Sequence, residues 1–132
     1  MELKIDIDRM RKWKAIHLVN FRLRWIDYYF KIFPAKIWIY KTHKGFHFYI
    51  DTNNKFNDFT IVTILFQSLL GSDWLRELRN FKRYDDGMVK NWNLMFDTKF
   101  TMHKGRIKTL SQEKFVMFYV LKKGWKHGET TS

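Results

Sequence analysis

Apolar and polar residues alternate most regularly on either side of a short polar turn in the first half of the chain. Residues 37–40 read Ile-Trp-Ile-Tyr and residues 46–50 read Phe-His-Phe-Tyr-Ile, with Gly45 in the segment between them. Aromatic and β-branched residues on both sides of a glycine-containing turn are typical of a β-hairpin. The pattern therefore predicts two antiparallel strands joined at this turn.

The predicted hairpin has one apolar face and one face that is both aromatic and polar. A two-residue loop formed by Lys44 and Gly45 would set the register of the strands. The facing pairs are then Tyr40 with Tyr49, Thr42 with His47, and Ile39 with Ile50. The apolar face comprises Ile39, Phe48 and Ile50, as expected for a core. The other face comprises Trp38, Tyr40, Thr42, His47 and Tyr49, and it is too aromatic and too polar for an ordinary solvated surface.

The N-terminal residues predict a strand followed by a helix. Residues 2–8 alternate strictly between apolar and polar, as in a strand with one buried face. From about residue 9 to residue 32, apolar side chains recur at the three- and four-residue spacing of an amphipathic helix. These side chains are Ile16, Val19, Leu23, Ile26 and Phe30. Asp8 is placed to cap this helix, and Pro34 ends it.

The rest of the chain predicts two further helices and at least one strand. The expected elements are a helix from Asn57 or Asp58 to Gly71, a basic helix from Trp74 to about Arg83 capped by Ser72 or Asp73, and a strand over residues 91–96. Residues 99–108 are basic and loop-like, with a hairpin about Gly105 as the alternative. Residues 111–123 fit a helix capped by Ser111, but residues 115–121 fit a strand equally well.

The order strand, helix, strand, strand, helix, strand predicts an α+β fold of the ferredoxin-like or RRM-like type. In this fold two helices cover one face of an antiparallel sheet. At 132 residues we expect a single domain, with its core in residues 2–98 and a C-terminal extension in residues 99–132. The other face of the sheet stays open unless the extension covers it.

Alternation sends three acidic side chains to this open face, namely Asp6, Asp8 and Asp97. The first and third strands of a ferredoxin-like sheet are neighbours, which places the first two carboxylates close to His47. Carboxylates at positions i and i+2, with a third from another strand, form a suitable site for Mg²⁺ or Mn²⁺. Such ions support phosphoryl transfer.

The charge of the chain favours a polyanionic partner. Lys and Arg number 25 against 13 Asp and Glu, which gives a net charge of +12. This balance favours nucleic acid ahead of a membrane surface, with simple solubility as the alternative. The predicted basic helix contributes Arg76, Arg79, Lys82 and Arg83, which indicate either phosphate contacts or a solvated helix face.

Other features of the composition favour a soluble cytoplasmic protein. No apolar run is long enough to span a bilayer, and acidic residues near the N-terminus stand where a signal peptide would be basic. The chain contains no cysteine, which removes disulfides and thiolate metal sites.

Three segments resemble motifs of the archaeo-eukaryotic primase-polymerases. They are Ile5-Asp6-Ile7-Asp8, Lys41-Thr42-His43-Lys44-Gly45-Phe46-His47 and Met95-Phe96-Asp97. Their order and strand placement are similar to the Asp-x-Asp strand, the Gly-x-His segment and the later acidic residue of that family. The resemblance implies that Asp6, Asp8 and Asp97 are catalytic metal ligands, and that His47 and the turn 42–45 contact a nucleotide triphosphate. Residues 71–76 and 91–96 also resemble small proteins of archaeal viruses and plasmids, which implies a location in the host cytoplasm.

The sequence thus supports three functions. The first is a minimal primase-polymerase-like nucleotidyltransferase, or an inactive relative of one. The second is a non-catalytic, RRM-like domain that binds single-stranded DNA or RNA. The third is a viral or mobile-element protein whose sheet binds a host protein.

Two features of the open face have structural alternatives. Trp38, Tyr40 and Tyr49 either stack on bases or form a second core beneath the C-terminal segment. His47 either contacts a nucleotide or is a surface histidine bonded to Thr42. A homodimer, if formed, is expected to use an exposed strand edge or the aromatic C-terminal segment.

Overall fold

The computed structural model describes residues 1–53, 60–85, 87, 98–103 and 106–123. In order, their elements are β1 (Glu2–Asp8), α1 (Lys12–Phe30), β2 (Ala35–Lys41), β3 (Gly45–Thr52), α2 (Thr60–Leu69), α3 (Trp74–Asp85), β4 (Thr98–His103), β5 (Arg106–Gln112) and β6 (Lys114–Leu121). The α+β class is therefore confirmed. The strand predicted at 91–96 lies outside the described residues, as does the predicted start of the second helix at Asn57 or Asp58.

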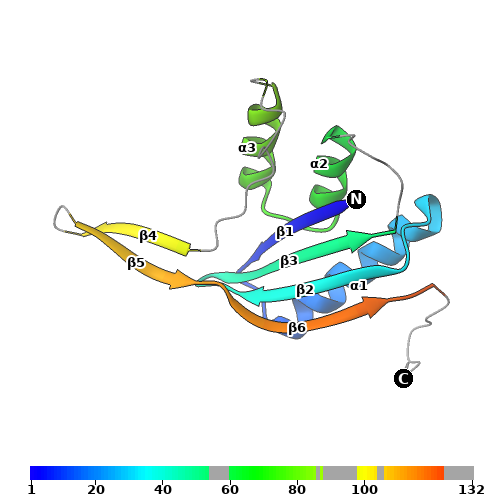
Figure 1. Ribbon diagram of the computed structural model, residues 1–132, viewed down its shortest axis with the longest axis horizontal. Helices are drawn as coiled ribbons and strands as arrows, with labels where there is room; N and C mark the ends of the chain where they lie inside the picture. Colours follow the sequence, from blue (N-terminus) through cyan, green and yellow to red (C-terminus); the bar gives the residue numbers. More distant parts are fainter. Residues whose placement is uncertain (54–59, 86, 88–97, 104–105, 124–132) are drawn as a thin grey trace.

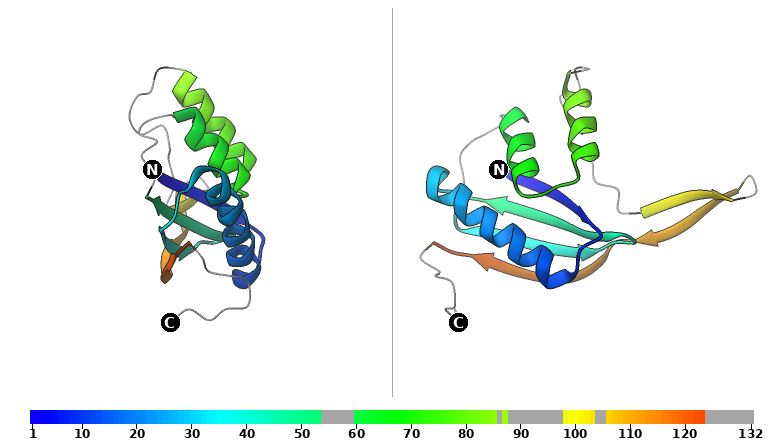
Figure 2. Two further views of the ribbon diagram at one scale, coloured as in Figure 1. Left: turned by 90° about the vertical axis from the view of Figure 1, so that its right-hand side faces the viewer. Right: turned by 180° about the vertical axis from the view of Figure 1, so that it is seen from behind.

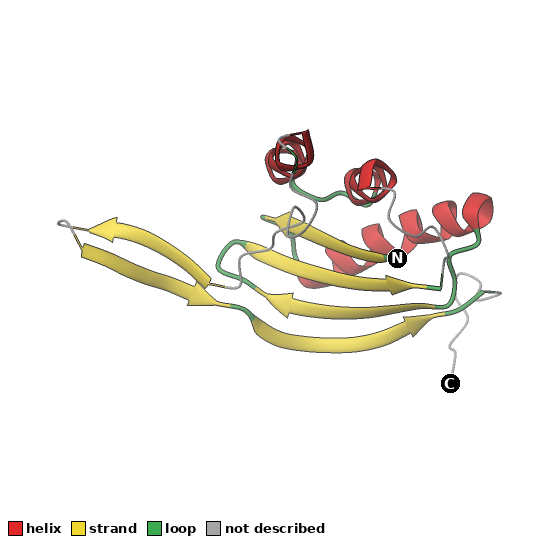
Figure 3. Ribbon diagram, turned by 45° about the horizontal axis from the view of Figure 1, so that its top comes forward, coloured by secondary structure: helices red, strands yellow, loops and turns green. Residues whose placement is uncertain are grey.

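The main sheet has four strands in the order β1-β3-β2-β6, and every neighbouring pair is antiparallel. Strands β4 and β5 form a separate two-stranded ribbon, which projects beyond one end of the main sheet (Figure 1). Only Glu113 separates β5 from β6, so the chain runs almost directly from the ribbon into the sheet (Figure 3). Of the two alternatives for the C-terminal segment, the strand is correct, and it extends the sheet beside β2.

Helix α1 lies along one face of the main sheet and forms the core with it (Figure 2). The buried helix residues are Ala15, Ile16, Val19, Leu23 and Ile26, and the strands contribute Leu3, Ile5, Ile7, Ile37, Ile39, Phe46, Phe48 and Ile50. The predicted helix stripe is therefore correct except at Phe30, which is 45% exposed near the end of the helix. Within the described ranges, no helix is both long and apolar enough to cross a membrane.

A buried hydrogen bond fixes β6 to the helix layer. The Tyr119 hydroxyl donates to Asn20 Oδ1 on α1 at 2.6 Å. Burial raises the pKa of Tyr119 above its ordinary value, so the phenol keeps the proton that it donates. This bond places Tyr119 on the α1 side of the sheet, and alternation then turns Phe118 to the opposite side.

The ends of α1 differ from the prediction. The helix begins at Lys12, and its N-cap residue, Arg11, makes no side-chain cap bond. Asp8 does not cap the helix, because it still belongs to β1 and pairs with Gly45. The chain turns at Arg9, whose φ is 57°. At the other end, Lys31 adopts the left-handed conformation before Pro34 is reached.

The hairpin between β2 and β3 is correct in its faces but wrong in its register. Tyr40 pairs with His47, and Trp38 pairs with Tyr49. The loop therefore lies one residue earlier than predicted, at 43–44, and every cross-strand partner moves by two residues. Since side chains alternate with a period of two, this shift leaves each residue on its predicted face.

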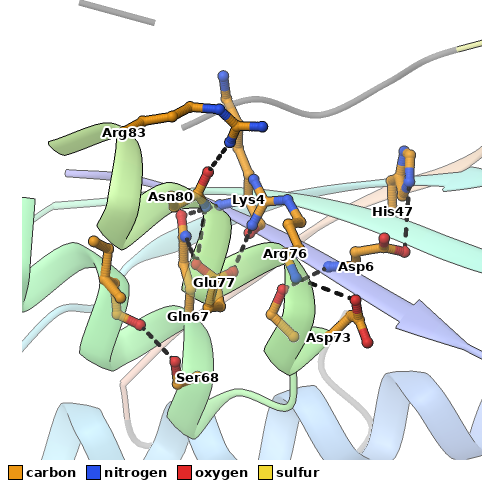
Figure 4. Close-up of polar contacts among 12 residues, drawn as sticks. Lys4, Asp6, His47, Gln67, Ser68, Asp73, Arg76, Glu77, Asn80 and Arg83 are labelled. Carbon is orange, nitrogen blue, oxygen red and sulfur yellow. Dashed lines mark hydrogen bonds and ion pairs between the residues drawn. The ribbon is translucent and has the colours of Figure 1, made fainter. Parts of the chain in front are cut away.

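The outer edge of β1 is closed by α2, α3 and the turn between them (Figure 4). The Lys4 N–H donates to Gln67 Oε1 at 2.9 Å, and the Asp6 N–H donates to Ser72 Oγ at 3.0 Å. The Asp73 N–H donates to the Asp6 carbonyl at 2.7 Å. Arg76 Nη1 donates to the Lys4 carbonyl at 2.9 Å. These bonds satisfy backbone groups that an edge strand would otherwise present to another chain.

The residues that close this edge are joined by Glu77. Its carboxylate accepts bonds from Gln67 Nε2 at 2.7 Å, Arg76 Nη1 at 2.6 Å and Asn80 Nδ2 at 3.0 Å. Burial lowers the pKa of Arg76 from its ordinary value, while the carboxylates of Glu77 and Asp6 act in the opposite direction. The network is almost fully buried, so its charges depend on each other for solvation.

Local sequence signals shape the turn between α2 and α3. Gly71, at a φ of +97°, ends α2, and the N–H groups of residues 71 and 72 donate to the carbonyls of Ser68 and Gln67, which is a Schellman motif. Asp73 caps α3 by accepting a bond from the Arg76 N–H at 3.2 Å. Of the two predicted caps, Asp73 is therefore the correct one, and the other residue, Ser72, instead bonds to β1.

We expect Glu77→Ala to destabilise the protein by about 3–5 kcal/mol, because it leaves the Arg76 guanidinium buried without its carboxylate partner. Urea unfolding followed by circular dichroism measures this change. The control is Arg79→Ala on the exposed side of the same helix, which should change the free energy of unfolding by less than about 0.5 kcal/mol. Equal losses in the two variants would contradict a structural role for the network.

Candidate functional site

The face of the sheet opposite α1 carries side chains in two rows that run across the strands. The register places Lys4, Tyr49, Trp38 and Phe118 in the first row, and Asp6, His47, Tyr40 and Phe115 in the second. All belong to the face that the sequence predicted to be open. The strand β6 lies beside β2 and adds two aromatic rings to this face, so this described part of the C-terminal segment extends the face and does not cover it as a second core.

The rings of the two rows contact one another. Trp38 and Phe118 have their centroids 5.0 Å apart, and Tyr40 lies 5.4 Å from Tyr49 and 5.5 Å from Phe115. The three rings on β2 and β3 are half-buried, whereas Phe115 and Phe118 are exposed. A shallow hollow of about 270 Å³ lies between Trp38, Tyr40, Tyr49 and Glu113. The rows therefore form a continuous aromatic surface with a polar residue at its border.

His47 stands between two carboxylates on this face. Its Nδ1 lies 2.5 Å from Glu113 Oε2, and its Nε2 lies 3.5 Å from Asp6 Oδ1. Tyr49 donates its hydroxyl to the same Glu113 oxygen at 2.6 Å. Figure 4 shows Asp6 reaching from β1 toward the imidazole ring. His47 is only 1% exposed, so these contacts form a buried link between β1, β3 and Glu113, which joins β5 to β6.

This geometry limits what His47 does chemically. The Nδ1 contact is a hydrogen bond, whereas the 3.5 Å between Nε2 and Asp6 Oδ1 is an ion-pair distance. Both ring nitrogens therefore face carboxylates of the protein in this conformation. The predicted bond from His47 to Thr42 is wrong, because the ring contacts Asp6 and Glu113 instead.

The residues predicted to hold a metal are only partly described. Asp6 is buried and faces His47, Asp8 is exposed at the end of β1, and Asp97 lies outside the described residues. Asp6 and Glu113 approach different nitrogens of one ring, which keeps their carboxylates apart. In the part of the chain that the structure describes, no three His, Asp or Glu side chains are grouped to hold an ion. The described donors alone therefore do not form a metal centre.

The turn predicted to contact a nucleotide triphosphate uses its polar groups internally. The Thr42 N–H donates to the Gly45 carbonyl at 2.9 Å, and the Gly45 N–H donates to Thr42 Oγ1 at 3.0 Å. Thr42 is buried, while Lys44 is exposed and its carbonyl accepts a bond from the Arg9 N–H. In this conformation, the Lys44 side chain can offer its charge to a ligand. The N–H groups of Thr42 and Gly45 cannot bind a ligand, because they already donate hydrogen bonds within the turn.

The cations of the basic helix fall into separate environments. Arg79 and Lys82 are exposed on α3, and Arg83 is half-buried with its guanidinium donating to Asn80 Oδ1 at 2.8 Å. Arg76 does not lie on the solvated helix face. Its guanidinium is within the buried network at the edge of β1, where it also acts electrostatically on Asp6 and Tyr49.

Three residues of the site were not identified from the sequence. Glu113, Phe115 and Phe118 reach the open face because β6 pairs with β2, and a register shift between Ile39 and Tyr40 brings Phe115 opposite Tyr40. Period-two alternation in residues 115–121 was the available signal. It was ambiguous because the same residues also fit a helix.

The comparisons with known proteins add no relative. No protein-family model, curated protein or solved structure matches the chain. The case for a function therefore rests on the residues described above.

We expect Gly45→Ala to destabilise the fold strongly, because β1 passes directly over this residue. A Cβ atom at position 45 would lie 1.9 Å from the Ile7 carbonyl oxygen and 2.8 Å from the Asp8 Cα. Backbone atoms of two paired strands cannot move apart without losing their hydrogen bonds, so we expect a loss of about 3 kcal/mol or more. Thermal unfolding measures it, and Lys44→Ala, exposed in the same turn, should be nearly neutral. Similar melting temperatures for the two variants would contradict the close approach.

Proposed function

We propose that the protein binds single-stranded nucleic acid on the open face of its main sheet. The observation that carries this proposal is the pair of aromatic rows formed by β3, β2 and β6. Stacking of bases on such rings is tolerant of sequence, because every base has a π-face. Two exposed rings, Phe115 and Phe118, are accessible to a base without any rearrangement of the core.

The charge distribution supports the same proposal. The chain has a net charge of +12, and exposed lysines lie on or beside the open face, including Lys36 and Lys44. Phosphates bound by such cations release counterions, which favours association at low salt. Arg79 and Lys82 are further exposed cations on α3, the helix that closes the β1 edge. Aromatic stacking with surrounding cations is the usual composition of a single-strand site.

The strand arrangement is compatible with a ferredoxin-like or RRM-like domain. The order β1-β3-β2, with α1 on one face, is the first half of that topology. Ferredoxin-like domains place a further strand beside β1. Here the outer groups of β1 at Lys4 and Asp6 bond to α2, α3 and their turn, so the proposed platform uses β6 at the opposite edge.

We expect Phe118→Ala to weaken binding to single-stranded oligonucleotides by about 1–3 kcal/mol with little change in stability. Phe81→Ala on α3 is a matched control, because Phe81 is 48% exposed and Phe118 is 46% exposed. Fluorescence anisotropy at several salt concentrations measures both affinities. The wild-type affinity should fall steeply as salt increases.

Three outcomes of this experiment would contradict the proposal. They are an absence of binding at low salt, a flat salt dependence, or an equal loss of affinity in the two phenylalanine variants. Tyr49→Phe tests the polar border, since it removes only the hydroxyl that donates to Glu113 and retains the ring. It should preserve most of the stacking contribution.

A catalytic form of the proposal is a divalent-metal-dependent nucleotidyltransferase, as the resemblance to primase-polymerases implies. The observation that favours it is the position of Asp6 and Asp8 on the same face as the rings. When bound, Mg²⁺ or Mn²⁺ would supply charge stabilisation for phosphoryl transfer. Asp8 is exposed and is therefore the described carboxylate best placed to meet an ion, with Asp97 as the implied third ligand.

For the catalytic form, we expect millimolar Mn²⁺ to raise the melting temperature of the wild type through ligand linkage. Asp8→Asn and Asp97→Asn should each abolish the rise, whereas Asp51→Asn, an exposed carboxylate on β3, should retain it. Asp8→Asn is preferable to a change at Asp6, because Asp6 is buried beside His47 and Arg76. If the wild type shows no metal-dependent shift, the catalytic form is wrong and the binding function remains.

A further inference from the structure

The side of α1 that faces away from the sheet is unusually aromatic for a solvated helix surface. Its exposed side chains include Phe21, Trp25, Tyr28 and Tyr29 in the C-terminal half of the helix. The opposite side of the same helix fills the core. A helix that is apolar on both sides is typical of one that is covered on both sides.

The exposed rings form an ordered ridge. Phe21, Trp25 and Tyr29 are spaced four residues apart, and neighbouring ring centroids lie 6.4 Å and 6.3 Å apart. Tyr28 packs edge-on against Tyr29 with the centroids 5.0 Å apart. Mutual packing restricts the rings before any partner arrives, which lowers the entropy lost on association.

A hollow lies on each side of this ridge. One, of about 670 Å³, is lined by Phe21, Arg24, Trp25, Tyr28 and Tyr29. The other, of about 480 Å³, lies between α1 and the end of α2 and is lined by Arg22, Trp25, Ile26, Tyr29, Phe30, Ser68 and Leu69. A ridge of residues at i, i+4 and i+8 with a groove beside it is complementary to a second ridge of the same kind, as in the commonest class of helix packing.

The aromatic ridge alone is smaller than one side of a standard protein interface, and exposed residues of α2 add to its area. Four aromatic side chains that are between 54% and 77% exposed offer about 500 Å² of ring surface. Leu65 and Leu69 on α2 are also exposed and extend the surface beyond the second hollow. A standard interface takes about 800 Å² from each partner, whereas the largest apolar patch of a typical monomer is about 300–600 Å².

The polar residues of the surface fit an interface as well. Arg22 already donates to the Leu69 carbonyl at 3.0 Å, and the single carboxylate of α1, Asp27, accepts a bond from the Phe33 N–H. Aromatic residues and arginine are enriched at interface centres, where Lys, Glu and Asp are depleted. In the half of α1 that carries the ridge, residues 21–29, arginine is the only cationic residue type.

We propose that two copies of this chain associate through the α1 ridge, with the ridge of each copy in a groove of the other. The contact is isologous, so one surface patch serves both copies about a two-fold axis near Trp25. An identical copy supplies a ridge of the same spacing as the grooves, which neither a lipid surface nor an extended nucleic acid does. The proposal is independent of the proposed function, because the open face of the sheet lies on the other side of the molecule. The dimer would present two such faces outward.

Sedimentation equilibrium over a range of concentrations tests the proposal. The protein should be treated with nuclease and studied at about 1 M salt, where the Debye length is about 3 Å and neither bound nucleic acid nor charge repulsion affects the result. The wild type should be a dimer. Trp25→Ala should weaken the dimer at least about 30-fold, as expected for a hot-spot residue. Trp13→Ala is the matched control on the same helix, since Trp13 is 58% exposed and Trp25 is 54% exposed. It should leave the association constant unchanged.

A second measurement uses the absence of cysteine from the chain. Trp13→Cys provides a single position for a nitroxide label, which lies 12 residues from Trp25 and hence about 18 Å along the helix. Across a two-fold contact at the ridge, the two labels should lie within about 40 Å and give a dipolar coupling. Adding Trp25→Ala should remove the coupling while the circular dichroism spectrum is retained.

Several outcomes would overturn the proposal. A wild type that stays monomeric at all concentrations would do so, as would a dimer that Trp25→Ala leaves intact. Binding of the monomer to vesicles of anionic phospholipid, lost in Trp25→Ala but not in Trp13→Ala, would assign the ridge to a membrane surface instead. Oligonucleotide affinity that depends on Trp25 in the monomer would assign it to nucleic acid.

Discussion

The hydrogen bonds from α2, α3 and their turn to the outer edge of β1 are the constraint on which the arrangement of this molecule depends. They use both the N–H and the carbonyl groups of Lys4 and Asp6, so β1 cannot accept another strand at these positions. The sheet therefore grows at its other edge, where β6 pairs with β2. That pairing brings Phe115 and Phe118 to the open face and places Glu113 beside His47. Buried polar side chains close the β1 edge of the sheet, and β6 completes the aromatic surface of the open face at the opposite edge.

The polar residues whose side chains are best suited to catalysis form structural contacts at the β1 edge and beside it. Arg76 and Asp6 lie where α3 meets β1, and His47 links Asp6 to the residue that joins β5 to β6. Buried charges are costly unless each has a partner, so these groups are arranged to solvate one another. Under the proposed function, affinity for nucleic acid would come mainly from the aromatic rings and the exposed cations. Asp8 remains exposed on this face, as do Glu2 and Asp51.

Structural features that follow from a local rule, such as alternation along a strand, could be predicted from the sequence. Features that depend on contacts between residues far apart in the chain could not. Alternation assigned Trp38, Tyr40, His47 and Tyr49 to the correct face even though the register was wrong, because a shift of two residues preserves the face. The error in register has a clear origin, since Gly45 was read as a turn residue. It is instead required because β1 crosses it, with the Ile7 carbonyl in the space that a Cβ would take. The burial of Arg76 could not be predicted in the same way. Its partners are on β1 and on the next residue of its own helix, and helical periodicity alone groups it with the exposed Arg79.

The distribution of aromatic residues follows from the same division of the molecule into faces. Phe46 and Phe48 fill the core between the sheet and α1, and two further groups of rings lie on the open face and on the outer side of α1. A core of this size needs large side chains on the inner side of each strand, but it does not need them on the far side of the helix. Exposed rings that pack in register with each other, such as Trp25 on Tyr29, have lost rotamer freedom without gaining the full benefit of burial. That loss is recovered when a partner covers them. The two aromatic surfaces lie on opposite sides of the core, so a partner on one leaves the other accessible. A dimer formed through α1 would carry two open faces, and a nucleic acid that reached both would be held by linked contacts more strongly than by either face alone.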